Sequence, residues 1–238
     1  AAAVRHACYL YAPFRLLWKP ESYSAGSLPT PESTQGLVKG ISSLMRRWDV
    51  KRTQAIPALV TSCQNMVNEI QRIYNRQAVI LYPPVELPVE PVSTDLEDYY
   101  LSVSRLISHK RVDVAVEACN RLNRKLIVVG DGPERQKLEQ MAGPTVSFTG
   151  RISDAALQDL YRKARGLIFP SYEDYGIVPL EAQAWGVPVI AFGKGGSLET
   201  VQEGTSGIFF NEQDAGSLVA ALEGFEQAVF EPQKIRQW

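Results

Sequence analysis

Short apolar runs alternate with helical patterns from residue 99 to residue 230, and this alternation constrains the fold more than any other feature of the chain. Each apolar run has the length of one strand, and the runs read YYLSVSR, KLIVVG, VSFTG, GLIF, VPVIA and GIFF. The helices predicted after them span residues 110–122, 133–141, 154–164, 178–185, 198–202 and 214–230. Strands and helices that alternate across short loops form right-handed βαβ units. The sequence therefore predicts an α/β fold, with a doubly wound parallel sheet covered by helices on both faces.

The first 85 residues predict a smaller α/β region. Three strands are expected in HACYLY, ALVTSC and AVIL, and apolar residues spaced three and four apart predict helices over residues 34–56 and 64–74. Ser62 is the expected cap of the second helix. Residues 86–98 are rich in proline and acidic residues and have no helical period. We interpret them as a linker between a partial N-terminal domain, residues 1–85, and a C-terminal domain, residues 99–238.

Charge and cysteine content exclude several classes of partner. The net charge is −1 with both signs well mixed, whereas a nucleic-acid backbone selects a basic face. Cys8, Cys63 and Cys119 are far apart and odd in number, which is typical of reduced thiols and not of a disulfide framework or a metal site. No apolar run approaches the ~20 residues that span a bilayer, and the N-terminus has no signal-peptide pattern. The sequence therefore predicts a cytoplasmic location and no bound metal.

The segment MRRWDVKR, within the predicted helix 34–56, also bears on where the protein is located. Several cations and a tryptophan on one helix suit peripheral contact with an anionic lipid surface. A solvated helix face is the alternative and the commoner role of such a run. The sequence leaves both interpretations open.

The stretch PSYEDYGIVPLEAQAWGVPVIA, residues 170–191, holds two carboxylates eight positions apart, Glu173 and Glu181. We place Glu173 in a strand-to-helix loop and Glu181 in the first turn of the following helix. Free N–H groups at such a junction carry partial positive charge and suit a diphosphate, while carboxylates accept hydrogen bonds from sugar hydroxyls. The stretch therefore predicts a nucleotide-sugar pocket. For either glutamate alone, solvation or a favourable interaction with the helix dipole is the simpler interpretation.

Two cations in SRLISHKR form the second part of the predicted site. Arg105 follows a strand, and Lys110 stands at the predicted start of the next helix, where a cation opposes the helix dipole. An anion bound between the two side chains would offset this cost, since arginine grips two phosphate oxygens and lysine supplies a point charge. Two exposed basic side chains are the alternative interpretation. The GDGP turn at Gly130 fits plain turn chemistry as well as ligand contact, because it lacks a full dinucleotide-binding pattern.

The segment EDYGIVPLE resembles the signature of two glutamates separated by seven residues in retaining glycosyltransferases of family 4. SRLISHKR, VGDGPE and FTGR occur upstream in the order of that family, and the resemblance covers about Tyr99 to Glu226. It implies the GT-B architecture of two Rossmann-like domains, complete here only for the C-terminal, donor-binding domain. It also implies transfer of a hexose, most similar to mannose, from a GDP- or UDP-linked donor to a glycan or lipid-linked acceptor. No metal and no cofactor besides the nucleotide sugar is implied.

The resemblance also assigns roles to residues. Arg105 and Lys110 would hold the donor diphosphate and stabilise the leaving nucleoside diphosphate, and Glu173 would face the donor sugar; these three are the predicted catalytic residues. Glu181 would accept hydrogen bonds from the ribose hydroxyls. The remaining predicted donor contacts are Ser104, Gly130, Arg151, Tyr175, Gly176, Ile177 and Val178.

The sequence departs from the family's pattern in its first part. Fewer than 100 residues precede the linker, so we expect a fragment of a larger enzyme that turns over slowly by itself. Where relatives have HTPxRxLW this chain has YAPFRLLW, with Tyr11 in the position of the histidine. Two alternatives to an active transferase therefore stay open. One is a fragment that binds nucleotide sugar without catalysis, and the other is a nucleotide-sugar epimerase of the same architecture.

Overall fold

The computed structural model describes residues 6–18, 32–93 and 95–238, and the chain divides into two compact units, residues 1–83 and 84–238. The second unit includes the proline-rich segment 86–98 that we interpreted as a linker. We describe each unit by itself.

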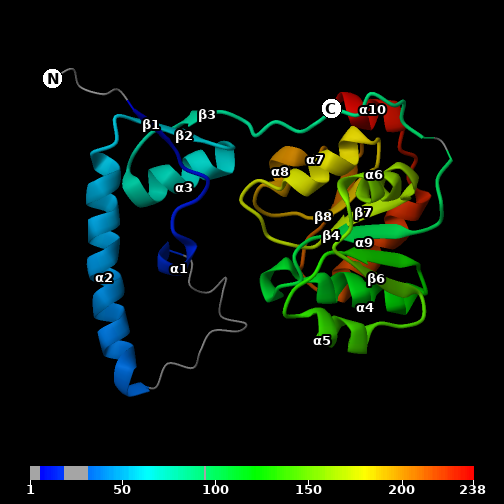
Figure 1. Cartoon of the computed structure of the whole chain (residues 1–238), viewed down its shortest axis with the longest axis horizontal. Helices are drawn as coiled ribbons and strands as arrows, with labels where there is room; N and C mark the ends of the chain where they lie inside the picture. Colours follow the sequence, from blue (N-terminus) through cyan, green and yellow to red (C-terminus); the bar gives the residue numbers. More distant parts are fainter. Residues whose placement is uncertain (1–5, 19–31, 94) are drawn as a thin grey trace. The chain divides into compact units, whose positions relative to one another are not determined.

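A six-stranded parallel sheet forms the centre of the second unit (Figure 1). Its strands, in chain order, are β4 (Tyr100–Val103), β5 (Leu126–Val129), β6 (Val146–Gly150), β7 (Gly166–Phe169), β8 (Val189–Phe192) and β9 (Gly207–Phe210). In space the order is β6-β5-β4-β7-β8-β9. The chain thus adds strands to one side of β4, then returns to β4 and adds strands to its other side. This is the doubly wound order of Rossmann-like domains, and its switch point lies between β4 and β7.

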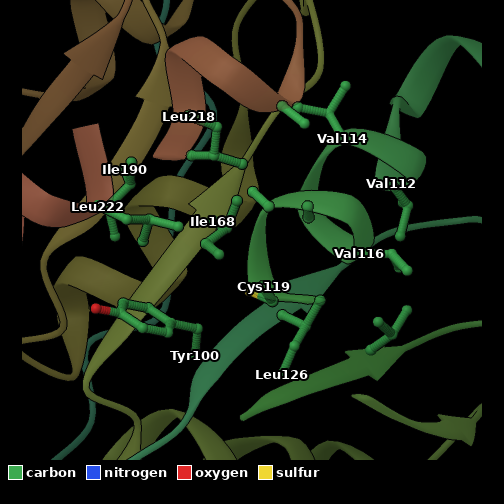
Figure 2. Close-up of a cluster of buried hydrophobic side chains, with 14 of the residues drawn as sticks. Tyr100, Val112, Val114, Val116, Cys119, Leu126, Ile168, Ile190, Leu218 and Leu222 are labelled. Atoms are coloured by element: carbon green, nitrogen blue, oxygen red, sulfur yellow. The ribbon is translucent and has the colours of Figure 1, made fainter. Parts of the chain in front are cut away.

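Helices cover both faces of this sheet and bury two hydrophobic cores. The helices are α4 (Val112–Leu122), α5 (Arg135–Met141), α6 (Asp154–Lys163), α7 (Ile177–Ala184), α8 (Ser197–Thr200), α9 (Ala215–Gln227) and α10 (Pro232–Gln237). Residues of α4, α5 and α9 share one core, which Figure 2 shows around Tyr100, Ile168 and Ile190. Residues of α6 and α7 share the other core with Leu101 and Leu167. Neighbouring strand residues thus point to opposite faces, and strands buried on both faces explain the continuous apolar runs.

Side chains cap the starts of two helices. Ser153 precedes α6 and accepts from the Ala156 amide at 3.3 Å, and Asp214 precedes α9 and accepts from the Ser217 amide at 2.8 Å. Such caps satisfy amides that the helix itself leaves unpaired. The helix predicted over residues 133–141 begins later, at Arg135, after a turn.

An ion-pair cluster joins elements at the amino edge of the same sheet. Arg124, just before β5, donates two hydrogen bonds of 2.6 Å to the carboxylate of Glu226 near the end of α9. The Tyr100 hydroxyl donates to the same carboxylate at 3.2 Å, and the Arg165 guanidinium lies 5.9 Å from the centre of the Tyr100 ring. The hydrogen bonds from Arg124 lower the pKa of Glu226. This amino-edge cluster therefore ties α9 to the starts of three strands.

The first unit holds a three-stranded parallel sheet of order β1-β2-β3, with β1 (Ala7–Tyr9), β2 (Ala58–Thr61) and β3 (Val79–Ile80). Its helices are α1 (Arg15–Trp18), α2 (Glu32–Gln54) and α3 (Gln64–Tyr74). Asp49 of α2 accepts from the Trp18 indole at 2.7 Å and from the Tyr74 hydroxyl at 2.8 Å, which joins the three helices. All three predicted strands and both predicted helices are present. The predicted cap was wrong, because Cys63 precedes α3 and makes no side-chain capping bond.

Within the described ranges, no helix is both long enough and apolar enough to cross a bilayer.

Candidate active site

Two loops meet at the switch point of the second unit. Residues 104–111 follow β4, and residues 170–176 follow β7. Because β4 and β7 are hydrogen-bonded neighbours, with Leu101 opposite Leu167, both loops leave the same edge of the sheet. The connections leave β4 and β7 toward opposite sides, so a crevice opens above the strand ends, where α/β domains of this topology bind ligands.

An ion pair between Lys110 and Glu173 bridges these two loops. The residues lie 63 positions apart in sequence, and their side chains are only 19% and 14% exposed. The fold thus brings two of the three predicted catalytic residues into contact. A partly buried pair of opposite charges is a site where an anion competes with Glu173 for the lysine. The arrangement therefore suits binding of a phosphate by Lys110, and such binding would release Glu173 from the ion pair.

The local structure around Lys110 differs from the prediction. Lys110 ends a short 3₁₀ helix, Ser108–Lys110, and does not start an α-helix. Arg111 then adopts a left-handed conformation with φ of 52°, and α4 begins at Val112. The prediction was wrong because a non-glycine residue in this conformation has no clear sequence signal. Lys110 therefore lies before the first turn of α4, and its side chain extends across the switch point to Glu173.

Ser104 and Arg105 leave polar atoms unpaired at the end of β4. The Ser104 hydroxyl oxygen is buried and has no hydrogen-bond partner in the described part of the chain. Arg105 is exposed, and within the described ranges no hydrogen bond or ion pair engages its guanidinium. Most buried polar atoms in proteins are paired, so an orphaned hydroxyl next to the unpaired Arg105 indicates a place for a polar ligand.

Glycines let the strand-end loops approach one another closely. Gly130, with φ of +129°, lies so near the loop after β4 that an added Cβ would stand 1.8 Å from the Ser104 carbonyl oxygen. Its amide donates to the Gly150 carbonyl at 2.9 Å, which also fixes the loop that leads into exposed Arg151. Gly130 therefore has a packing role here, and its predicted contact with the donor stays a prediction, as does that of Arg151.

A glycine turn after β8 supports the loop that carries Glu173. The Gly196 amide donates to the Glu173 carbonyl at 2.8 Å. A Cβ on Gly196 would stand 2.3 Å from the Tyr175 backbone. Gly176, with φ of +92°, packs on the Phe169 ring and directs the chain into α7, which begins at Ile177 and Val178. The glycine turn after β8 is visible in the sequence, but its contact with the Glu173 loop is not.

Glu181 lies in the second turn of α7, not in the first turn as predicted. It lines a pocket of about 300 Å³ between α6 and α7. The Tyr161 hydroxyl of α6 donates to its Oε2 atom at 3.2 Å. Burial raises the pKa of Glu181, and the hydrogen bond from Tyr161 acts against that rise. Sequence analysis missed Tyr161, because only the packing of α6 on α7 brings the two side chains together.

The predicted site residues thus fall into two groups. Ser104, Arg105, Lys110 and Glu173 lie on the two loops at the switch point, and Glu181 lies in the pocket, in the second turn of α7. Among the residues that the structure describes, no cluster of three or more histidine, cysteine or acidic side chains is arranged to hold a metal ion.

A doubly wound sheet with cationic groups and an orphaned hydroxyl at its switch point defines the class of Rossmann-like ligand-binding domains. A family profile described as "Glycosyl transferases group 1" matches residues 97–226, more than half of the chain. The chain belongs to this family of group 1 glycosyltransferases. The family match contains both loops of the switch point and the whole pocket side of α6 and α7.

Individual relatives agree with the family assignment. The chain is 34% identical over 123 residues to the GDP-mannose-dependent alpha-mannosyltransferase of Corynebacterium glutamicum, covering 51% of this chain and 30% of that protein. It is 33% identical over 138 residues to the GDP-mannose-dependent alpha-(1-6)-phosphatidylinositol monomannoside mannosyltransferase of Mycolicibacterium smegmatis, covering 50% and 36%. The chain therefore spans about a third of the length of these curated relatives.

Solved structures show the same fold. An Anabaena protein crystallised with UDP and glucose superposes with a TM-score of 0.69 at 18% identity, covering 97% of this chain and 69% of that one. The fold is of the GT-B type, with parallel sheets and alternating helices.

Proposed function

We propose that this chain is the donor-binding part of a retaining glycosyltransferase. It would take a nucleoside-diphosphate sugar, GDP- or UDP-linked, and transfer the hexose, most similar to mannose, to a glycan or a lipid-linked acceptor. The Lys110–Glu173 ion pair across the switch point is the single observation that carries the proposal. It supplies a cation for the diphosphate and a carboxylate for the sugar at the same edge of the sheet. The GDP-mannose dependence in the names of two relatives makes GDP-mannose the first donor to test.

The proposed reaction follows from the charges of the site. The bond between the anomeric carbon and the diphosphate oxygen breaks, and Arg105 and Lys110 stabilise the negative charge that develops on that oxygen. The acceptor hydroxyl attacks from the same face, and its proton passes to the leaving phosphate, so configuration is retained. Glu173, released from Lys110, accepts a hydrogen bond from a hydroxyl of the donor sugar. We propose that Arg105, Lys110 and Glu173 are the protein groups that act in these steps and that no step needs a metal.

Calorimetric titration of the chain with GDP, UDP, GDP-mannose and UDP-glucose tests the proposal. We expect one of the two nucleoside diphosphates to bind, and its sugar derivative to bind as well. We expect Glu181→Ala to weaken that binding. We expect Glu173→Ala to reduce transfer more than binding, and the chain by itself to turn over slowly. Unchanged nucleotide affinity in Glu181→Ala would contradict the assignment of the pocket. Conversion of a nucleotide sugar into its epimer would favour an epimerase, and binding without transfer in the full-length protein would favour a non-catalytic role.

We further propose a cytoplasmic protein that contacts the membrane surface through α2. The apolar side chains Ile41, Leu44, Met45 and Trp48 are exposed along one side of this helix. The Arg52 guanidinium lies 5.6 Å from the centre of the Trp48 ring on the same side. An apolar stripe with cations beside it suits an anionic lipid surface. In cosedimentation with phosphatidylglycerol vesicles we expect binding that Trp48→Ala weakens; equal binding to phosphatidylcholine vesicles, or none to either, would contradict this proposal.

A further inference from the structure

Tyr161 is a buried phenol that the proposed chemistry does not use. Its side chain is 2% exposed and packs in the core shared by α6, α7 and the sheet. Its hydroxyl donates to Glu181, and this is its one side-chain hydrogen bond within the described ranges. Burial raises the pKa of Tyr161 further above its ordinary value, so the phenol stays protonated at neutral pH and acts as a donor.

Glu181 has few other means of keeping its charge and its orientation. The pocket around it is also lined by two other acidic residues, Asp154 and Glu86, and by no lysine or arginine. Burial and the nearby charge of Asp154 both disfavour the ionised carboxylate, whereas the bond from Tyr161 favours it. Within the described part of the chain, Oε2 is the only carboxylate atom of Glu181 that accepts a hydrogen bond. The second oxygen, Oε1, is thus left to accept a hydrogen bond from a ligand.

We infer that Tyr161 is a positioning residue for nucleotide binding. Its hydroxyl holds Oε2 of Glu181, so that Oε1 is presented to a hydroxyl of the donor ribose. This inference rests on the proposed function, in which Glu181 binds the ribose. Tyr161 is 2% exposed and its hydroxyl is engaged by Glu181, so we expect it to act on the nucleotide through Glu181.

The test compares ribonucleotides with deoxynucleotides. Affinities for GDP and UDP, and for their 2′-deoxy and 3′-deoxy forms, are measured by calorimetry on the whole chain and on Tyr161→Phe. We expect Tyr161→Phe to weaken binding of the ribonucleotide about three- to tenfold, the effect of losing one typical hydrogen bond. The deoxynucleotide that lacks the contacted hydroxyl should bind the two chains within about twofold, because the affected contact is then absent.

A matched control is available in the same core. Tyr99 is 5% exposed, and its hydroxyl donates to the Leu160 carbonyl at 2.8 Å, one residue before Tyr161. Tyr99→Phe therefore removes a buried phenol bond to α6 without touching Glu181, and nucleotide affinity should not change. Glu181→Asp is a second variant, since it withdraws the carboxylate from the phenol by one methylene. It should reproduce the loss that is selective for the ribonucleotide.

The outcomes separate the two claims. Equal weakening of ribonucleotide and deoxynucleotide binding by Tyr161→Phe, or the same effect from Tyr99→Phe, would show a purely structural role and overturn the inference. If Glu181→Asp loses ribonucleotide binding selectively and Tyr161→Phe does not, the inference fails and the proposed function stands. If the unchanged chain binds no nucleoside diphosphate, both fail together.

Discussion

The polar and charged side chains at the two edges of the six-stranded sheet differ in how completely the protein itself pairs them. At the amino edge, Arg124 and Glu226 are joined by two short hydrogen bonds, and Tyr100 adds a third. At the carboxyl edge, Arg105 is exposed and the Ser104 hydroxyl is buried, and neither side chain has a hydrogen-bond partner in the described ranges. Charges at the amino edge are thus satisfied by the protein itself. Those at the carboxyl edge are satisfied only in part.

This difference indicates which residues serve stability and which serve binding. A charge that is fully paired inside the protein contributes to folding, and its loss leaves a partner uncompensated. An exposed or unpaired polar group contributes little to folding and is available to a ligand. Substitutions at the two edges should therefore change different measurable quantities.

The largest expected effect is a loss of stability when Gly130, at the carboxyl edge of the sheet, is replaced. Gly130→Ala places a Cβ where the Ser104 carbonyl stands, in a backbone conformation that side chains rarely adopt. We expect a loss of about 3 kcal/mol of unfolding free energy, from overpacking together with backbone strain. Gly204→Ala is the control, because Gly204 also has a positive φ, +75°, but has open space around it. Chemical denaturation measures both, and equal losses would show that close packing of the loops is not the cause.

Loss of Lys110 should have the next largest effect, which is a loss of nucleotide affinity. Lys110→Ala removes a cation from the switch point, and we expect GDP affinity to fall about tenfold to thirtyfold. GMP has no β-phosphate, so its affinity should fall much less. Calorimetry with the two nucleotides checks this, and thermal denaturation measures separately what the loss of the ion pair with Glu173 costs in stability. An equal effect on both nucleotides would contradict a diphosphate contact.

A substitution at the amino edge should lower stability and leave nucleotide affinity unchanged. Glu226→Gln weakens the bonds from Arg124 and Tyr100, and we expect a loss of about 1 to 2 kcal/mol of stability with unchanged nucleotide affinity. Glu223→Gln, at an exposed position of the same helix, is the control.

The pH dependence of that loss has a definite sign. Because the folded-state pKa of Glu226 is lowered below its usual value of 4.5, its stabilising effect is present above that value and disappears as pH falls through the lower, folded-state pKa. The stability difference between the unchanged chain and Glu226→Gln should therefore shrink on acidification below about pH 4.5. A difference that stays constant down to the acid transition would contradict this assignment.

The smallest predicted effect is an increase in affinity. Glu173→Gln removes the charge that competes with phosphate for Lys110, so GDP should bind about threefold more tightly while hexose transfer falls. Weaker GDP binding in this variant would mean that Glu173 assists the diphosphate and does not compete with it.

The same comparison shows what sequence could predict. The strands of the second unit were predictable because each is buried on both faces and reads as an apolar run. The sequence and its family resemblance predict Glu173 and Lys110 as site residues, and that role stays a prediction. Their mutual contact was not predictable, since it depends on β4 and β7 becoming neighbours across 63 residues. The left-handed Arg111 and the bond from Tyr161 to Glu181 were also hidden, because tertiary packing determines both.

The most direct test of the account maps nucleotide binding onto the two edges by NMR. Amide chemical shifts of the labelled chain are followed during titration with GDP and with UDP. The account predicts that the nucleotide that binds will shift residues 104–111 and 173–181 and leave the residues around Arg124 and Glu226 unchanged. Saturable binding that shifts the amino edge and spares the carboxyl edge would contradict it.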